Sequence, residues 1–281
     1  MSVQLPLPLD WCLRWRDGRH SWRHRSDGGF DSGHFEVAPI SESDARAYVV
    51  RHHYSRSYPG TRLRYGLFRR NALVGVAVLS VPVRAEVLTG VFPRLTPYQE
   101  SLELGRFVLD DAVPANGESW FLARVWELAA ADGVRGVVSF SDPVPRTTTS
   151  GRAIFPGHVG TIYQASNSLY LGRGRARTLK LLPDGTVLND RSVAKVATQD
   201  RGHEYVERQL VAFGARPPEV GEDMRAWLAE ALATVRVRRL PHGGNHRYAF
   251  ALGTPAERRA IRADLRRRAL LPYPKRVDKA A

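Results

Sequence analysis

Hydrophobic positions between residues 34 and 190 form two kinds of pattern. Short apolar runs of strand length alternate with longer stretches in which apolar residues recur at helical spacing. The short runs predict strands at 34–41, at 62–81 (two strands that turn at Arg70-Asn71), at 100–110, at 135–140 and within 168–190. The longer stretches predict helices at 42–56, 113–134 and 157–167.

The predicted helices carry capping residues at their ends. Ser41 precedes the first helix, Asn116 or a neighbour opens the second, and Gly133 closes it. The elements then follow as strand, helix, three strands, helix, strand, helix, strand. This order predicts an α/β (α+β) fold, a mixed sheet with helices on both faces.

The segment before this core is a basic, tryptophan-containing arm, in which Trp11, Trp15 and Trp22 stand among arginines. One interpretation is contact with nucleic acid, in which the tryptophans stack on bases. The other is a strand pair that packs its tryptophans on the domain. The sequence leaves both open.

The segment after the core is a basic C-terminal extension. It is predicted to be helical over 190–235, to form a hairpin around Gly243-Gly244 and to end in a capped basic helix. We therefore expect three parts, the arm at 1–33, the catalytic core at 34–190 and the extension at 191–281.

The charge of the chain indicates its partner. Its 281 residues include 42 Lys and Arg against 28 Asp and Glu, a formal net charge of +14. Such a surface attracts polyanions, so double-stranded DNA is the expected partner. A codon bias toward arginine is the alternative explanation, although it accounts for the choice of arginine over lysine better than for the net charge.

The composition also indicates in which compartment the protein is found. No apolar run approaches the about 20 residues that a membrane span needs, and the N-terminus lacks the pattern of a signal peptide. We expect a cytoplasmic protein without a membrane partner. The single cysteine, Cys12, excludes an internal disulfide framework.

Asp142 follows the apolar run 135–140 almost directly and is followed by Pro143. The carboxyl ends of strands in an open α/β sheet face the ligand crevice. A carboxylate there can accept hydrogen bonds from the exocyclic amine of adenine, and Asp-Pro-Val-Pro partly imitates the Asp-Pro-Pro-aromatic loop of adenine-N6 methylating enzymes. A turn that Asp142 caps is the structural alternative.

The end of the first predicted helix gathers His52, His53, Tyr54 and arginines. Neutral imidazole is the commonest metal ligand in proteins, and His53 is the better placed of the two histidines. A capping or solvated role is the alternative for both.

The order of elements over about 34–190 resembles the GNAT acyltransferase fold, in which the fourth and fifth strands splay apart and a cofactor lies between them. This resemblance implies a general acid at Tyr163, in Gly160–Gly172. It also implies a phosphate-binding loop at the start of the long helix, where Asn116, Gly117 and Ser119 stand. Here the sequence departs from the pattern of acyl-CoA users, with one glycine and Glu118 next to it.

Five strings together, HHYSRSYPG, LELGRFVLDDAVPANGESWFLARV, VVSFSDPVPRTT, PGHVGTIYQASNSLYLGRG and GGNHRY, resemble the Mom family of phage DNA modification proteins over about 40–275. The resemblance implies conversion of adenine in duplex DNA to N6-carbamoylmethyladenine, which protects phage DNA from restriction. It implies a functional set of His53, Tyr54, Arg106, Ser119, Asp142 and Tyr163.

The implied reaction attaches a methylene carbon to N6, which an acetyl donor does not do by ordinary acyl transfer. We therefore expect acetyl-CoA or a related acyl donor together with a redox metal, with iron held by His53 and Asp142. This role competes with Asp142 as the acceptor for adenine. Arg106 is expected to bind a phosphate or acyl carbonyl, or else to pair with Glu103.

Contacts with the DNA backbone are expected from basic residues at the helix end and in the extension, namely Arg51, Arg56, Arg62, His246 and Arg247. Two other functions remain open. One is a conventional GNAT N-acetyltransferase for a small amine, and the other is a catalytically dead GNAT-like protein that binds DNA.

Overall fold

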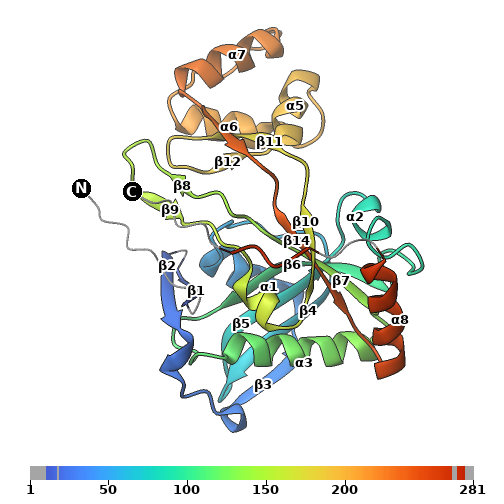
Figure 1. Ribbon diagram of the computed structural model, residues 1–281. Helices are drawn as coiled ribbons and strands as arrows, with labels where there is room; N and C mark the ends of the chain where they lie inside the picture. Colours follow the sequence, from blue (N-terminus) through green and yellow to red (C-terminus); the bar gives the residue numbers. More distant parts are fainter. Residues whose placement is uncertain (1–10, 18, 268–270, 276–281) are drawn as a thin grey trace. The chain divides into compact units, whose positions relative to one another are not determined.

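The computed structural model describes residues 11–17, 19–267 and 271–275. The chain divides into two compact units, one of Met1–Pro143, Gly157–Gly174 and Asn245–Ala281, and one of Val144–Pro156 and Arg175–Gly244 (Figure 1). These units differ from the predicted parts because the chain leaves the first unit and re-enters it twice.

A seven-stranded sheet forms the centre of the first unit. Its order is β10-β14-β7-β6-β5-β4-β3, and every pair of neighbours is antiparallel except β6 and β7. The mixed α/β sheet predicted from the sequence is confirmed. Its strands are β3 (Phe35–Pro39), β4 (Thr61–Arg69), β5 (Ala72–Ser80), β6 (Ser101–Leu109), β7 (Gly136–Ser141), β10 (Leu169–Arg173) and β14 (His246–Ala251).

Helices cover both faces of this sheet. Successive residues of a strand point to opposite faces, and Val137 of β7 packs with Val125 of α3, whereas Val138 packs with Leu265 of α8. Among the described residues, no helix is both long and apolar enough to cross a membrane. The helices of this unit are α1 (Glu42–His52), α2 (Glu86–Thr89), α3 (Gly117–Ala131), α4 (Thr161–Ala165) and α8 (Pro255–Arg266).

Local chemistry explains where these elements begin and turn. The Ser41 hydroxyl accepts a hydrogen bond from the backbone N–H of Asp44 at 3.1 Å and so caps α1. Arg70 and Asn71 adopt φ of 52° and 64°, which is the geometry of a tight two-residue hairpin between β4 and β5. Gly133 follows α3 with a φ of 88°, as expected for a helix stop.

The two parallel strands diverge partway along their length. β6 and β7 pair from Ser101 with Gly136 to Leu104 with Ser139. Beyond that point β6 continues to Leu109 along β5, and β7 continues to Ser141 along β14. This is the divergence of the fourth and fifth core strands that the GNAT resemblance implied.

The N-terminal arm forms an antiparallel hairpin of β1 (Trp11–Arg16) and β2 (Arg19–His24). Trp15 on β1 is only 5% exposed. The structure therefore supports the second interpretation of the arm, a strand pair that packs tryptophan on the domain. Two single-turn 3-10 helices, η1 (Arg25–Asp27) and η2 (Ser32–His34), connect the hairpin to β3.

The second unit has a core of its own, in which Trp227, Leu210 and Val196 are buried together. Its three-stranded sheet has the order β12-β11-β13, beside a two-stranded pair of β8 and β9. Its elements are β8 (Arg146–Thr147), β9 (Ala153–Phe155), β11 (Arg177–Leu181), β12 (Val187–Leu188), α5 (Asp190–Thr198), α6 (Glu204–Ala212), α7 (Met224–Thr234) and β13 (Arg238–His242).

The hairpin predicted around Gly243-Gly244 is not formed. β13 pairs with β11, whereas β14 inserts between β7 and β10. The reason is burial, because Tyr248 and Ala249 point to opposite faces and both are fully buried. A two-stranded hairpin cannot cover both faces of a strand, but a central position in a sheet can.

Candidate active site

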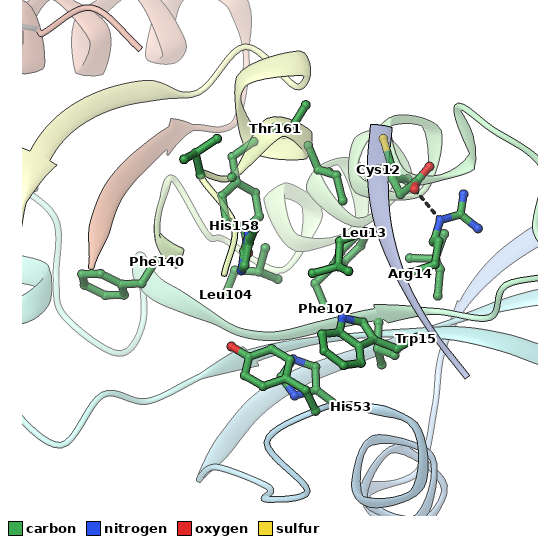
Figure 2. A pocket seen from close by; sticks show the side chains of 18 of the residues that line it. Cys12, Leu13, Arg14, Trp15, His53, Leu104, Phe107, Phe140, His158 and Thr161 are labelled. Atoms are coloured by element: carbon green, nitrogen blue, oxygen red, sulfur yellow. Dashed lines mark hydrogen bonds and ion pairs between the residues drawn. The ribbon is translucent and has the colours of Figure 1, made fainter. Parts of the chain in front are cut away.

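A cavity of about 110 Å³ lies where β6 has left β7. Phe107 reaches into it from β6, Leu13 and Trp15 from β1, and His158 from the loop before α4 (Figure 2). His53, Tyr54 and Tyr163 line the same cavity. Three of the predicted catalytic residues are therefore brought together, although Tyr163 lies more than a hundred positions after the other two in the sequence.

His53 ends α1 and holds a defined tautomer. It is 7% exposed, and its Nδ1 accepts the backbone N–H of Ser55 at 3.1 Å and lies 2.8 Å from the Ser55 hydroxyl. Burial lowers the pKa of His53 well below the usual 6.5, and positive charge on Arg106 and His158 lowers it further. The ring is neutral at neutral pH and carries its proton on Nε2.

Tyr54 connects His53 to the N-terminal hairpin. The Tyr54 ring lies 4.2 Å from the His53 ring and 5.0 Å from the Trp15 ring, between ring centroids. Aromatic pairs at such distances stabilise one another beyond the burial of area alone. The hairpin thus supports the predicted catalytic corner directly.

Tyr163 lies in α4, far from the α1 corner in sequence but on the same cavity. Burial raises the pKa of its hydroxyl to about 12, and the Ser139 hydroxyl on β7 beside it partly offsets this. At neutral pH the hydroxyl is protonated and able to donate. The general-acid role that the GNAT resemblance implied for Tyr163 stays a prediction.

Asp142 stands directly after the last residue of β7, at the carboxyl end of the strand as the sequence predicted. It is buried, and its backbone carbonyl accepts the N–H of His158 at 2.8 Å. This bond attaches the loop that carries His158 to the end of β7. Asp142 itself is not among the side chains that line the cavity.

The predicted iron ligands, His53 and Asp142, are not joined, in the part of the chain that the structure describes, by a third side chain that could complete a metal site. Within the described ranges, no three His, Cys, Asp or Glu side chains are grouped so that they could hold a metal ion. In addition, Nδ1 of His53 is engaged by the backbone N–H and the hydroxyl of Ser55, so only Nε2 is left to face a ligand. The residues present do not fit an iron held by His53 and Asp142.

Arg106 forms hydrogen bonds with the loop after α1. Its Nε donates to the Ser57 carbonyl at 2.9 Å and its Nη2 to the Ser57 hydroxyl at 2.8 Å. The predicted pairing with Glu103 is not among its hydrogen bonds. Arg106 therefore holds the segment that follows His53 and Tyr54 in place.

The predicted cofactor loop before α3 does not fit a diphosphate. Asn116 is in the left-handed region with φ 74°, and the Ser119 hydroxyl donates to the Asn116 carbonyl at 3.1 Å. A Cβ on Gly117 would lie 2.5 Å from Val113, so this glycine is required by packing. Glu118 is buried in an ion pair with Arg14. The start of α3 is thus occupied by the protein's own groups, which leaves no cradle for the phosphates of CoA.

The residues predicted to contact DNA lie in different settings. Arg51, Arg56 and Arg62 are exposed; Arg51 pairs with Asp17 at 2.9 Å, and Arg62 lines a separate hollow with Asp132 and Glu257. Arg247 is half-buried and donates to the Leu171 carbonyl.

His246 is 4% exposed, and its Nδ1 lies 2.8 Å from the Tyr170 hydroxyl. This burial argues against a contact between His246 and DNA. The sequence placed it in an exposed hairpin, whereas β14 is an interior strand.

Sequence reasoning missed His158 and Arg14 as parts of the cavity. His158 stands in the quoted string PGHVGTIYQ, five residues before Tyr163, and a histidine in a glycine-bounded loop next to a candidate catalytic tyrosine was an available indication. Nothing local distinguishes Arg14 from the other arginines of the arm, because its role depends on partners about 100 residues away.

Comparison with known proteins identifies the family. No curated protein matches this sequence. Among solved structures, a GNAT family acetyltransferase from Elizabethkingia anophelis with acetyl-CoA bound is similar at 10% identity over 78% of this chain and 99% of that chain, with a TM-score of 0.33. A tandem GNAT protein from the clavulanic acid biosynthesis pathway is similar at 13% identity over 77% and 70%, with a TM-score of 0.34. The family model described as the Mom protein family matches residues 34–275, and this chain therefore belongs to the Mom protein family.

Proposed function

We propose that this chain modifies adenine in double-stranded DNA and converts it to N6-carbamoylmethyladenine. One observation carries the proposal. In a chain of the Mom family, the cavity at the divergence of β6 and β7 gathers His53, Tyr54 and Tyr163. The net charge of +14 supports DNA as the macromolecule to which the chain binds.

Duplex adenine is stacked and paired, so an enzyme that acts on N6 must turn the base out of the helix. An engineered cavity of about 150 Å³ in another protein holds a benzene ring. The cavity here measures about 110 Å³ and must widen to receive a purine. We expect it to open at the contact between Trp15 and Tyr54, which can then stack on the base.

The reaction forms a bond between adenine N6 and the methylene carbon of the transferred group, the bond from that carbon to the leaving group of the donor breaks, and N6 loses one proton. We assign acceptance of the N6 hydrogen to the carboxylate of Asp142, which lies two residues after the lining residue Phe140 but outside the lining of the cavity, and which meets the base only after the cavity has widened. Tyr163, which is protonated at neutral pH, is assigned as the proton donor to the leaving group. His53 presents an N–H and is assigned to hold an acceptor atom of the base or of the donor.

Mass spectrometry of nucleosides tests the proposal. Plasmid DNA from cells that express the chain is expected to contain deoxyadenosine heavier by the mass of one glycine residue. A gain equal to an acetyl group would instead support the conventional N-acetyltransferase. Unmodified DNA that the purified chain nevertheless binds would support the non-enzymatic DNA-binding protein.

Asp142→Asn is the matched variant for the site. It keeps the size of the side chain but removes the charge, and we expect loss of the modified nucleoside with DNA affinity retained. Glu36→Gln, at an exposed position of β3, is the control that should leave both unchanged. Modification at the wild-type level in Asp142→Asn would refute the assigned role.

A further inference from the structure

The hairpin of β1 and β2 lies outside residues 34–275, the part of the chain that the family model matches. Even so, Leu13, Arg14 and Trp15 of β1 and Trp22 of β2 line the cavity. Figure 2 shows β1 crossing the cavity wall next to α3, with Leu13 and Trp15 turned toward the interior. The hairpin is therefore a wall of the candidate site.

Arg14 fastens this wall to the segment that leads into α3. It is 1% exposed, and its Nη1 donates to the carbonyls of Asp110 at 3.0 Å and Val113 at 2.7 Å. Its Nη2 donates to the Pro114 carbonyl at 3.2 Å, and its Nε pairs with Glu118. Every nitrogen of the guanidinium group is thus engaged by the protein, and none is left to bind a phosphate.

The groups in the first turn of α3 are likewise occupied by contacts within the protein. A helix N-terminus attracts an anion, and here the anion is the carboxylate of Glu118, which is 3% exposed. Gly117 offers no open approach, because a Cβ at that position would meet Val113 at 2.5 Å and Phe30 at 3.3 Å. Phe30 in turn packs on Trp120, with 5.4 Å between ring centroids. A second anion would have to displace both Glu118 and the hairpin.

We propose that the N-terminal hairpin closes this site to CoA thioesters, and that the donor carries no nucleotide diphosphate. The inference rests on the hairpin and the α3 turn. It holds whether the acceptor is adenine or another amine.

Calorimetric titration of the full chain with acetyl-CoA, and separately with adenosine 3′,5′-bisphosphate, tests the proposal. We expect no saturable heat at millimolar concentrations of either compound. Stoichiometric binding of acetyl-CoA would overturn the proposal. This experiment does not depend on detection of any modified base, so its failure and that of the adenine proposal are separate outcomes.

The single cysteine supplies a second measurement. Cys12 lies on β1 next to the Arg14 anchor, and burial together with the charge of Glu118 raises the pKa of its thiol to about 12. A thiol of this kind reacts slowly. We expect labelling of Cys12 by a thiol reagent to be slow and unchanged by acetyl-CoA. Labelling that accelerates when acetyl-CoA is added would show that CoA displaces the hairpin, and would overturn the proposal.

Two variants calibrate this measurement. Arg14→Ala removes the anchor and is expected to raise the labelling rate of Cys12 at least tenfold. Arg19→Ala, at an exposed position of β2, is the matched control and should label at the wild-type rate. Equal rates in Arg14→Ala and wild type would show that Arg14 does not hold the hairpin, and would count against the proposal.

Discussion

Arg14 of the N-terminal hairpin and Glu118 in the first turn of α3 form a buried ion pair between positions 104 residues apart. The pair joins a segment outside the family-matched part of the chain to the helix that packs on the central sheet. Removal of one charge from such a pair leaves the other buried without compensation, which is far costlier than the absence of both.

Arg14→Ala is therefore expected to lower the free energy of unfolding by about 3–5 kcal/mol. Chemical denaturation followed by tryptophan fluorescence measures this change. The double variant Arg14→Ala/Glu118→Ala should lose less than the sum of the two single variants. The exposed control Arg19→Ala should change stability by no more than about 0.5 kcal/mol. Equal losses in Arg14→Ala and Arg19→Ala would contradict the role of the pair.

His53 should make stability depend on pH in a defined direction. Its folded-state pKa is lowered well below 6.5, so below pH 6.5 the unfolded chain binds a proton that the folded chain does not. Stability present above pH 6.5 is then lost progressively as the pH falls toward the folded-state pKa. The slope per group reaches at most about 1.4 kcal/mol per pH unit.

His53→Asn is expected to remove that part of the slope between about pH 6.5 and pH 5. His246 should contribute a slope of its own, because burial and the charge of Arg173 lower its pKa to about 4. Denaturation at a series of pH values measures both, with the exposed His34→Asn as the control. An unchanged slope in His53→Asn would show that His53 is not buried in its neutral form.

Tyr163→Phe removes the hydroxyl, the proposed proton donor, and keeps the aromatic ring. The ring packs against Tyr248 and Phe250, with centroids 5.5 and 6.1 Å away, and phenylalanine keeps this packing. We expect the rate of adenine modification to fall by about 10²–10⁴, the usual contribution of a general acid. DNA affinity and the melting temperature should stay near wild type. A variant with undiminished modification would exclude the hydroxyl as the donor.

Arg56 is an exposed arginine two positions after the His53–Tyr54 corner. If it contacts a DNA phosphate, Arg56→Ala should reduce the slope of log affinity against log salt concentration by about 0.9. DNA-binding titrations over a range of salt concentrations measure this slope. Arg225→Ala, exposed on α7, is the comparison variant. Equal slopes in wild type and Arg56→Ala would remove Arg56 from the DNA interface.

Much of the fold could be predicted because it follows from local patterns. The period of apolar residues identified β3 to β7 and α1 and α3, and the caps at Ser41 and Gly133 marked helix ends. The position of Asp142 after β7 followed from the same pattern, since a buried strand must end where the apolar run ends.

The candidate site was predicted only in part. His53 and Tyr163 do share a cavity, but a hydrogen bond from Arg106 to Glu103 is not formed and the exposed position of His246 does not agree with its burial. Arg106 donates two hydrogen bonds to Ser57, 49 positions away in sequence, and no periodicity encodes that distance.

The sequence by itself determined the elements of the core, their order and the end of the strand that carries Asp142, because hydrophobic period and caps act over a few residues. Tertiary structure alone decided that β14 enters the central sheet and that the arm becomes a cavity wall. The same is true of the burial of Arg14 against Glu118. These features depend on pairing between distant segments and on burial of charge. The sequence around a charged residue does not show whether its side chain is exposed to solvent or buried against a partner.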